Sequence, residues 1–409
     1  MNKLIIIAFS FCPIIIHGQE KLLKKGNEYF EIQQYKLALD NYVKVADQDH
    51  IKSTIRHQTN LKIAECFLNM HNPVKSEVYY SKVYNGGIEF SYEQKIGYVN
   101  ALMEVGQYNK ASEVLLTIEG EFYKKKILAN KIEFALSDNS INKSIRISSL
   151  ETELGYSSYG ISLIHNKLVF INPISHVKSK EKIRSYRFFY EDGEVIYELE
   201  RLKLPHNFNS LSLDYRNNII YYSGNIVELD EYVDYEREDK EIGAGGVNNL
   251  SIWYMPLSGD KEKPTRLTYT SIDYSFTHPF VTPNGKTLYF TSNVLGSYGG
   301  YDLYKMEKSG EEWSLPENLG RKINTFLNEG YPFFSEGVLY FSSEGHPGYG
   351  GLDIFKTDTS TIKVENLKKP VNSSFDDFYY MHINPKKGYF SSNRNNENGI
   401  DGFYKFESK

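Results

Sequence analysis

The sequence predicts a two-domain protein in which an N-terminal α-solenoid of helical repeats is followed by an all-β five-bladed propeller. Two observations lead to this fold class. A short pattern of aromatic, serine and glycine residues recurs about every 50 residues in the C-terminal two thirds of the chain, a period typical of propeller blades. Small and aromatic residues recur at a shorter period, that of helix pairs, in the first part of the chain. The length of 409 residues suits two domains.

The chain begins with the features of a secretory signal peptide, which we predict at residues 1–18. Lys3 precedes a long apolar run, and the small residue Gly18 comes directly before Gln19. The run is too short for a membrane span, so no transmembrane segment is expected. The mature chain would start near Gln19 and keep one cysteine, Cys66, which excludes a disulfide framework.

Residues 19–140 carry the pattern of a helix-turn-helix repeat, in which a small residue lets two helices approach and aromatic rings fill the groove between them. The first copy holds Gly26, Tyr29, Tyr35, Ala38 and Tyr42, the second holds Ala64, Phe67, Ser76 and Tyr80, and the third holds Tyr108, Ala111 and Leu115. This pattern resembles that of tetratricopeptide repeats, about three of them, with residues 119–137 as a capping helix. Cys66 is expected on an inward helical face as a small core residue.

The propeller, predicted at residues 141–409, depends on three clear copies of one blade pattern. Each copy has a phenylalanine in its strongest strand, and these residues, Phe290, Phe341 and Phe390, are 51 and 49 positions apart. Runs of aromatic and β-branched residues bounded by Gly, Asn and Pro are typical of strands. The period and the strand pattern together indicate blades.

Two weaker copies, at residues 169–170 and 221–223, raise the predicted number of blades to five. Residues 227–239, rich in Glu, Asp and Tyr, would be a surface loop inserted between two of them. The last copy ends after its third strand, which would leave an exposed sheet edge. We therefore predict that residues 144–150, which alternate in polarity, close the ring by pairing with residues 402–406.

An aspartate follows a glycine-containing turn in every clear copy. Asp302 and Asp353 lie 12 residues after the strand phenylalanine, and Asp401 lies 11 residues after it. A carboxylate fixed at one place in each repeat indicates a hydrogen bond to turn amides, repeated blade by blade. We interpret these three residues as structural.

Composition and motifs exclude several classes of function. The net charge of −5 and the pI near 6.1 give no basic surface for nucleic acid. The glycine-rich stretch at residues 243–246 precedes a strand rather than a helix and so lacks the geometry of a phosphate loop. Paired cysteines and histidine pairs at metal-ligand spacing are absent from the sequence. We therefore expect no catalytic centre, cofactor or metal.

Three groups of residues are candidates for ligand or partner binding. The acidic residues Asp273, Glu329, Asp376 and Asp377 come just before the inner strands. The central channel would be lined by His278, Phe280, Tyr331, Phe333, Tyr380 and His382. Tyr298 and Tyr349 lie in loops, where tyrosine offers a large contact area at low entropic cost.

The acidic residues leave an enzymatic alternative open. Glycoside hydrolysis requires two carboxyl groups on either side of the scissile bond, and a propeller channel can hold such a pair. The simpler interpretation is that each carboxylate caps the loop that enters its blade. The offsets of Asp273, Glu329 and Asp377 from the strand phenylalanines drift from 17 to 12 to 13 residues, which favours loop capping.

The order of segments resembles a known family. A signal peptide, tetratricopeptide repeats and a WD40-like or TolB-like propeller occur together in periplasmic, outer-membrane-associated proteins of Bacteroidota, including the peptidoglycan-linked component of the type IX secretion system. Here the propeller motifs are residues 313–320, 339–343, 350–355 and 391–394. Those relatives continue into an OmpA-like peptidoglycan-binding domain, whereas this chain ends at Lys409, so the resemblance does not imply anchoring to the cell wall.

The resemblance and the residues together predict a non-enzymatic scaffold or adaptor that is secreted across the inner membrane and binds proteins of the cell envelope. A solenoid offers a concave groove and a propeller offers a rigid face of loops. Two alternatives remain open: a carbohydrate-active or other hydrolase that uses carboxylates at the channel, and a propeller that binds a solute or glycan without turnover. The oligomeric state and the partner are not predicted.

Overall fold

The structure of the protein, a computed structural model, describes most of the chain. The described residues are 13–49, 51–120, 122–138, 140–150, 159–164, 167–174, 185–192, 195–198, 208–214, 216–224, 249–256, 264–271, 273–394 and 401–409. Side chains of residues 13–18 and 151–209 are not among those described. The first twelve residues of the predicted signal peptide, the predicted surface loop at residues 227–239 and the glycine-rich stretch at 243–246 lie outside these ranges.

The chain forms two compact units, Met1–Leu102 and Met103–Lys409. The helices of the first unit are α1 (Pro13–Glu31), α2 (Tyr35–Ala46), α3 (Ser53–Asn69), α4 (Pro73–Tyr84) and most of α5 (Tyr92–Glu104). Successive helices pack against each other from α1 to α4. None of the helices in the described ranges combines the length and the apolar character that a membrane span requires.

Small residues allow the helices of the first unit to approach closely. A Cβ atom added to Gly26 would lie 2.7 Å from Cε1 of Tyr42, and one added to Gly97 would lie 2.5 Å from the hydroxyl of Tyr80. Ala38, Tyr42 and Cys66 belong to one buried apolar cluster. The contacts explain why these residue types are needed, and the assignment to tetratricopeptide repeats stays a prediction.

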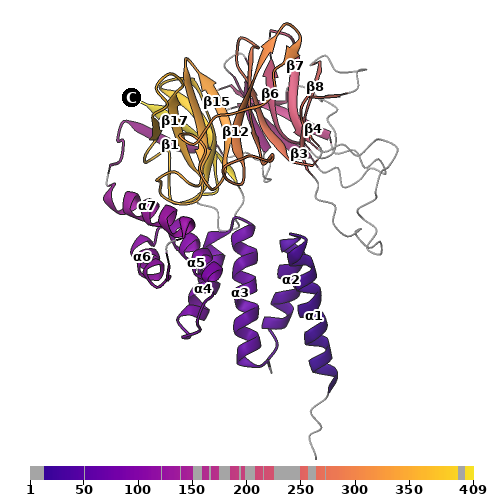
Figure 1. The fold of residues 1–409 in the computed structure, drawn as a ribbon, viewed down its shortest axis with the longest axis vertical. Helices are drawn as coiled ribbons and strands as arrows, with labels where there is room; N and C mark the ends of the chain where they lie inside the picture. The colour runs from indigo at the N-terminus through magenta and orange to yellow at the C-terminus, as the bar shows by residue number, and fades with distance from the viewer. Residues whose placement is uncertain are drawn as a thin grey trace, which may run out of the picture. The chain divides into compact units, whose positions relative to one another are not determined.

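In the part of the second unit that the structure describes, two helices, α6 (Tyr108–Leu116) and α7 (Tyr123–Ser137), accompany the β-sheets (Figure 1). Four sheets form blades. The first contains β6 (Phe208–Asp214), β7 (Ile219–Gly224), β8 (Ser251–Pro256) and β9 (Thr265–Arg266); the second contains β10 (Phe276–Val281), β11 (Thr287–Ser292), β12 (Asp302–Ser309), β13 (Glu312–Trp313) and β14 (Glu317–Asn318). The third contains β15 (Glu329–Ser335), β16 (Val338–Ser343), β17 (Asp353–Asp358) and β18 (Val364–Asn366); the fourth contains β19 (Asp377–Asn384), β20 (Lys387–Ser392), β21 (Gly402–Ser408) and β1 (Ile145–Leu150).

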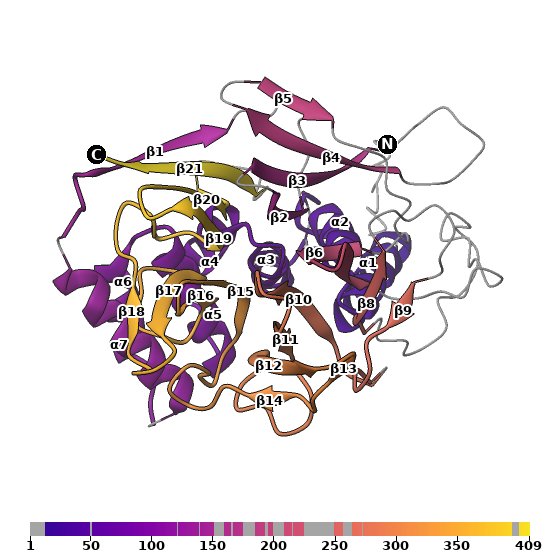
Figure 2. The same cartoon turned by 90° about the horizontal axis from the view of Figure 1, so that it is seen from above.

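The innermost strands of the blades follow one another around the axis. β6 lies beside β10, β10 beside β15 and β15 beside β19, as the view from above shows (Figure 2). The repeated phenylalanines Phe290, Phe341 and Phe390 are buried in the apolar clusters formed by the blades. The strand pattern therefore supplies the core of the propeller.

The outermost strand of the fourth blade comes from the N-terminal end of the propeller sequence. β1 pairs antiparallel with β21, from Ile145 opposite Ser408 to Leu150 opposite Phe403 (Figure 2). This is the strand pair that the alternation of residues 144–150 predicts. Ile145, Ile147 and Leu150 also pack against the apolar cluster of the blade. The edge of β21 is thus covered by a segment more than 250 residues away in sequence.

The prediction of a five-bladed propeller is wrong for the structure as described, in which the propeller has four blades. The weak copy at residues 169–170 falls in a further sheet, with β2 (Tyr159–Ile164), β3 (Lys167–Ile174), β4 (Ser185–Asp192) and β5 (Val195–Glu198). The side chains of this sheet lie outside the described residues, so no described core makes it a blade. A match of only two residues was too little sequence on which to base a blade.

Candidate functional site

The aspartates that recur in the blades cap turns. Asp302 accepts hydrogen bonds from the backbone amides of Tyr298 at 2.7 Å and Gly299 at 3.1 Å. Asp353 accepts from the amides of Tyr349 at 2.7 Å and Gly350 at 3.3 Å. Both aspartates are fully buried. The turns before β12 and β17 are therefore held in the same shape.

Asp401 lies directly before β21, at the position that corresponds to Asp302 and Asp353. It is partly buried, and the six residues before it lie outside the described ranges. The turn before β21 therefore lies outside the described residues.

The acidic residues that precede the inner strands are used to cap loops. Glu329 accepts hydrogen bonds from the amide and hydroxyl of Thr325, both at 2.7 Å, and from the hydroxyl of Ser343 at 2.6 Å. Burial raises the pKa of Glu329 to about 7, although these hydrogen bonds oppose the shift. Asp273 is exposed and bonds to the hydroxyl of Ser271.

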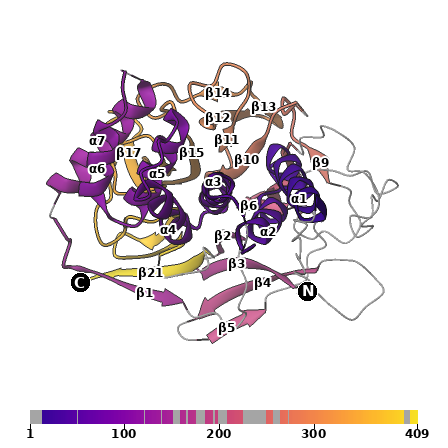
Figure 3. The same cartoon turned by 90° about the horizontal axis from the view of Figure 1, so that it is seen from below.

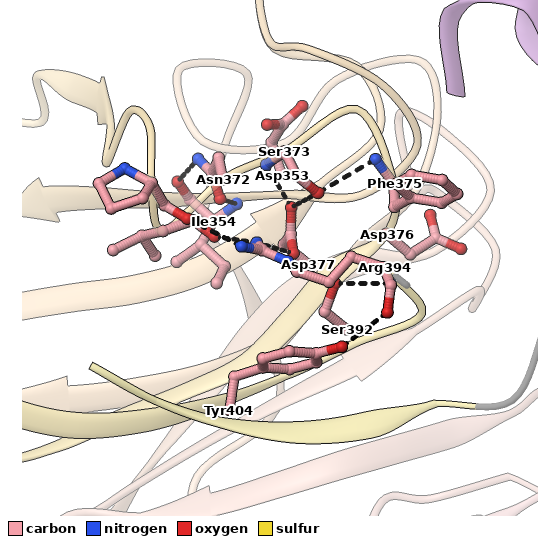
Figure 4. Close-up of polar contacts among 12 residues, drawn as sticks. Asp353, Ile354, Asn372, Ser373, Phe375, Asp376, Asp377, Ser392, Arg394 and Tyr404 are labelled. Carbon is pink, nitrogen blue, oxygen red and sulfur yellow. Dashed lines mark hydrogen bonds and ion pairs between the residues drawn. The ribbon is translucent and has the colours of Figure 1, made fainter. Parts of the chain in front are cut away.

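Asp377 and Asp376 occupy the corresponding places in the fourth blade (Figure 4). Asp377 accepts from the amide of Ser373 at 2.6 Å and is paired with the guanidinium of Arg394. Burial raises the pKa of Asp377, and the charge of Arg394 opposes this shift. Asp376 accepts from the backbone amide of Leu352 at 2.8 Å. Asp377 thus caps its own loop and pairs with a residue after β20, whereas Asp376 bonds to the turn before β17 in the neighbouring blade.

The inner strands carry a stack of aromatic rings. His278, Tyr331 and Tyr379 have positive φ angles of 49°, 55° and 52°, and each lies in a bulge of its strand. The rings of His278 and Tyr331 are stacked with centroids 3.9 Å apart, and those of Tyr331 and Tyr379 are 4.5 Å apart. Burial lowers the pKa of His278 to about 3, and its Nδ1 has no hydrogen-bond partner. The imidazole of His278 is therefore uncharged at neutral pH.

The structure corrects the alignment of the third copy by one residue. The bulge places Tyr379, not Tyr380, at the position of His278 and Tyr331. Phe333 and His382 instead pack with each other at 5.1 Å, and Tyr380 packs with Tyr340 at 4.8 Å. Phe280 also contacts Phe333, at 5.3 Å. Only His278 and Tyr331 of the six predicted channel residues belong to the stack.

The two candidate loop tyrosines lie in different surroundings. Tyr349 is fully buried by α7: its ring lies 5.2 Å from that of Phe134, and its hydroxyl donates to Asp138. Tyr298 is half-buried and lines a groove of about 570 Å³ beside the first turn of α7. The groove is also lined by the exposed aromatic pair Tyr123 and Phe326, whose ring centroids are 5.5 Å apart.

Sequence reasoning missed Lys131, the residue that joins α7 to the propeller. The ammonium of Lys131 is buried and donates to three backbone carbonyls, those of Glu344 at 2.8 Å, Gly350 at 2.5 Å and Gly351 at 3.1 Å. Burial lowers the pKa of Lys131. The negative charges of nearby carboxylates, of which Asp353 has the largest effect, oppose this shift. In the views from the side and from below, α7 lies against the blade that contains β17 (Figures 1 and 3).

Within the described residues, no cluster of three or more His, Cys, Asp or Glu side chains has the geometry to hold a metal ion. Glu329, Asp376 and Asp377 accept hydrogen bonds from backbone amides, and the groove beside Tyr298 is lined by the exposed side chains of Tyr123 and Phe326. The fold and these loops define a β-propeller protein that carries the helix α7 on one of its blades.

Comparisons with known proteins give no family. No protein-family model matches the sequence, and no curated protein matches it. Among solved structures, the chain is similar to a putative TolB from Agrobacterium tumefaciens, with a TM-score of 0.36, 13% identity and coverage of 61% of this chain and 76% of that one.

Two further similar structures have other activities in their names. One is a GH43_1 enzyme from Xanthomonas citri, with a TM-score of 0.38, 11% identity and coverage of 68% of this chain and 93% of that one. The other is the tricorn protease, with a TM-score of 0.34, 12% identity and coverage of 60% of this chain and 26% of that one. Similarities this distant assign no activity to the present protein.

Proposed function

We propose that the protein is a non-enzymatic scaffold or adaptor that is secreted across the inner membrane and binds other proteins of the cell envelope. By the family resemblance, the assembly would be a type IX secretion system or a related complex at the outer membrane. The observation that carries the proposal is the contrast between bonded carboxylates and an exposed aromatic groove. Glu329 and Asp377 are bonded within their loops, whereas Tyr123 and Phe326 are more than half exposed beside the groove.

Exposed aromatic side chains on a rigid loop face favour protein binding. Tyr and Phe are enriched at protein interfaces because they bury a large area with few rotatable bonds. The turns around the groove are fixed by Asp302, whose carboxylate holds two amides. A partner would therefore meet a surface that needs little ordering on binding.

A binding propeller without turnover is the second candidate, because the Nδ1 atom of His278 in the aromatic stack is buried without a hydrogen-bond partner. Buried polar atoms normally have one. A solute that donates or accepts a hydrogen bond at this place would satisfy it. The hydrolytic alternative lacks such support, because the acidic residues it needs are bonded to backbone amides and hydroxyls.

Cross-linking in the native cell tests the proposal. The full chain, carrying a photoreactive residue in place of Phe326, is irradiated in living cells, and the covalent products are separated and identified by mass spectrometry. A scaffold is expected to yield a discrete product with an envelope protein. The matched control places the same residue at Leu315, which is 68% exposed on the second blade. The absence of any protein product from either position, together with binding of a glycan or solute by the purified chain, would contradict a scaffold role.

A further inference from the structure

Two turns of the propeller are copies of each other in both geometry and contacts. Residues 298–302 precede β12, and residues 349–353 precede β17. The amides of Tyr301 and Leu352 each donate to a side-chain oxygen from the following loop, of Asn328 at 3.0 Å and Asp376 at 2.8 Å. The two turns therefore present their backbone carbonyls and their tyrosine in the same way.

The loops that follow the two turns are also equivalent. The side-chain amide of Asn324 bonds to both the N–H and the C=O of Leu303, and that of Asn372 does the same with Ile354. Three positions before each asparagine, a cation lies over the tyrosine ring of the turn: Arg321 over Tyr298 at 5.0 Å and Lys369 over Tyr349 at 4.6 Å. The equivalence therefore extends to the charged residue on the tyrosine.

One of these two equivalent surfaces is already occupied by a helix. α7 places Lys131 on the carbonyls of Gly350 and Gly351, and Phe134, three residues later, on the ring of Tyr349. Residues three apart lie on the same face of a helix, so both contacts come from one side of α7. Docking leaves Tyr349 with 0% exposure and buries Gly350.

The other surface is open. Tyr298 and Gly299 are half-buried, Gly300 is exposed, and all three line the groove of about 570 Å³. Phe326, Leu327 and Tyr123 also line it. Tyr123 is 53% exposed and Phe326 is 56% exposed, so two large aromatic side chains remain available there.

We propose that this groove is the docking site for a helix of a partner protein, which presents a lysine and, three residues later, an aromatic residue. The inference rests on the proposed scaffold function and specifies its binding site. The lysine ammonium donates to the carbonyls of Gly299 and Gly300, as Lys131 does to those of Gly350 and Gly351. The aromatic residue packs between Tyr298 and Phe326. Carbonyl oxygens solvate the buried cation, and the rings supply the apolar contact area.

The charges around the groove make this docking weaker than that of α7. Lys131 lies near the carboxylates of Asp353, Glu344, Glu104 and Asp376. The groove has Asn328 where the α7 site has Asp376, and Lys124 lines its rim. The lysine of a partner helix is therefore stabilised less by nearby carboxylates than Lys131 is. This difference suits a reversible interaction with a partner rather than permanent packing.

The test uses a fluorescein-labelled peptide of residues 123–138, the sequence of α7, as the model helix, and measures its fluorescence anisotropy with the chain of residues 19–409. We expect saturable binding. Replacing the residue that corresponds to Lys131 or Phe134 in the peptide by Ala is expected to weaken binding by about tenfold or more. Phe326→Glu in the protein is expected to do the same, whereas the matched control Leu315→Glu, on the same blade, leaves binding unchanged.

Several outcomes overturn the proposal. If the peptide fails to bind, if a scrambled peptide binds equally well, or if Phe326→Glu has no effect, the groove does not accept such a helix. If Phe326→Glu abolishes binding but the Lys131→Ala peptide binds normally, the lysine is not recognised. If the peptide instead binds by displacing the protein's own α7, binding persists in the Phe326→Glu protein. If cellular cross-links to an envelope partner persist in the Phe326→Glu protein, the scaffold function stands while the groove is excluded as its site.

Discussion

Asp377 and Arg394 form an ion pair in which the carboxylate side chain is fully buried and the arginine side chain is 11% exposed. The guanidinium also donates to the carbonyls of Pro370, at 2.8 Å, and Val371 (Figure 4). The hydroxyl of Tyr404 donates to the carbonyl of Arg394 at 2.6 Å. The pair therefore joins the loop before β19, the loop after β20 and strand β21.

Removing the arginine is expected to destabilise the propeller strongly. Arg394→Met leaves the Asp377 carboxylate buried without its counter-charge, and breaking such a pair costs about 3–5 kcal/mol. Urea denaturation followed by tyrosine and tryptophan fluorescence measures the free energy of unfolding of the propeller. Arg266→Met, in the exposed strand β9, is the matched control. The double variant Asp377→Asn with Arg394→Met is expected to recover part of the loss, and a cost below about 1 kcal/mol for Arg394→Met contradicts the role of the pair.

Replacing the buried lysine of α7 is expected to release that helix from the propeller. In Lys131→Met the side chain keeps its length, but three carbonyls lose their donor, which we expect to cost about 3 kcal/mol. Hydrogen exchange of the α7 amides measures the release, because a detached helix exchanges faster. Lys126→Met, at an exposed position of the same helix, is the control and should exchange as the native protein does. Unchanged exchange in Lys131→Met would mean that α7 is held by its apolar contacts alone.

Some features of the site could be predicted because the residue type and its place in the repeat left one physical explanation. The Asp302 and Asp353 carboxylates recur after a glycine turn without another metal ligand, and both accept amide hydrogen bonds. The pairing of β1 with β21 could be predicted because an unpaired last strand needs a partner and Ile145 and Ile147 alternate with polar residues.

Other features depend on contacts that the sequence does not display. A lysine within a helix is normally a solvated residue, so nothing in the sequence separates Lys131 from Lys124 or Lys126. The offset between Tyr379 and Tyr380 arises from a bulge, which changes the register without changing the residue pattern. The number of blades was overcounted where a single aromatic match stood for a whole repeat.

The stability of the propeller is expected to depend on the protonation of Glu329. Burial raises the pKa of this carboxyl from 4.5 to about 7, so the folded protein binds the proton more tightly than the unfolded chain does. The stabilisation is complete below the unfolded pKa of about 4.5 and is lost as the pH rises through about 7. Glu329→Gln removes this dependence. We expect the free energy of unfolding of the native protein, relative to that of the variant, to fall by up to about 3 kcal/mol between pH 4.5 and 7.

The comparison between the native protein and Glu329→Gln isolates one carboxyl from the others that titrate in this range. Burial also raises the pKa of Asp353 to about 7, and its contribution is present in both proteins and cancels. Denaturation at a series of pH values gives the difference directly. Glu312→Gln, at an exposed residue, should show no such pH dependence relative to the native protein. A constant difference between native and Glu329→Gln across the range would show that the Glu329 carboxyl titrates normally in the fold.

The turn that receives α7 is expected to tolerate no side chain at Gly350. A Cβ atom there would lie 1.6 Å from the backbone carbonyl oxygen of Ser374, so the loop before β19 would have to move. Because that loop carries the residues that cap Asp377, we expect Gly350→Ala to lower the free energy of unfolding by about 3 kcal/mol, at the upper end of overpacking costs. Gly402→Ala is the matched control, since its Cβ would be no closer than 3.5 Å to any atom and a strand position accepts alanine. Thermal unfolding of both variants decides the point: equal midpoints would mean that the turn yields to an added methyl group and does not fix the carbonyls that hold Lys131.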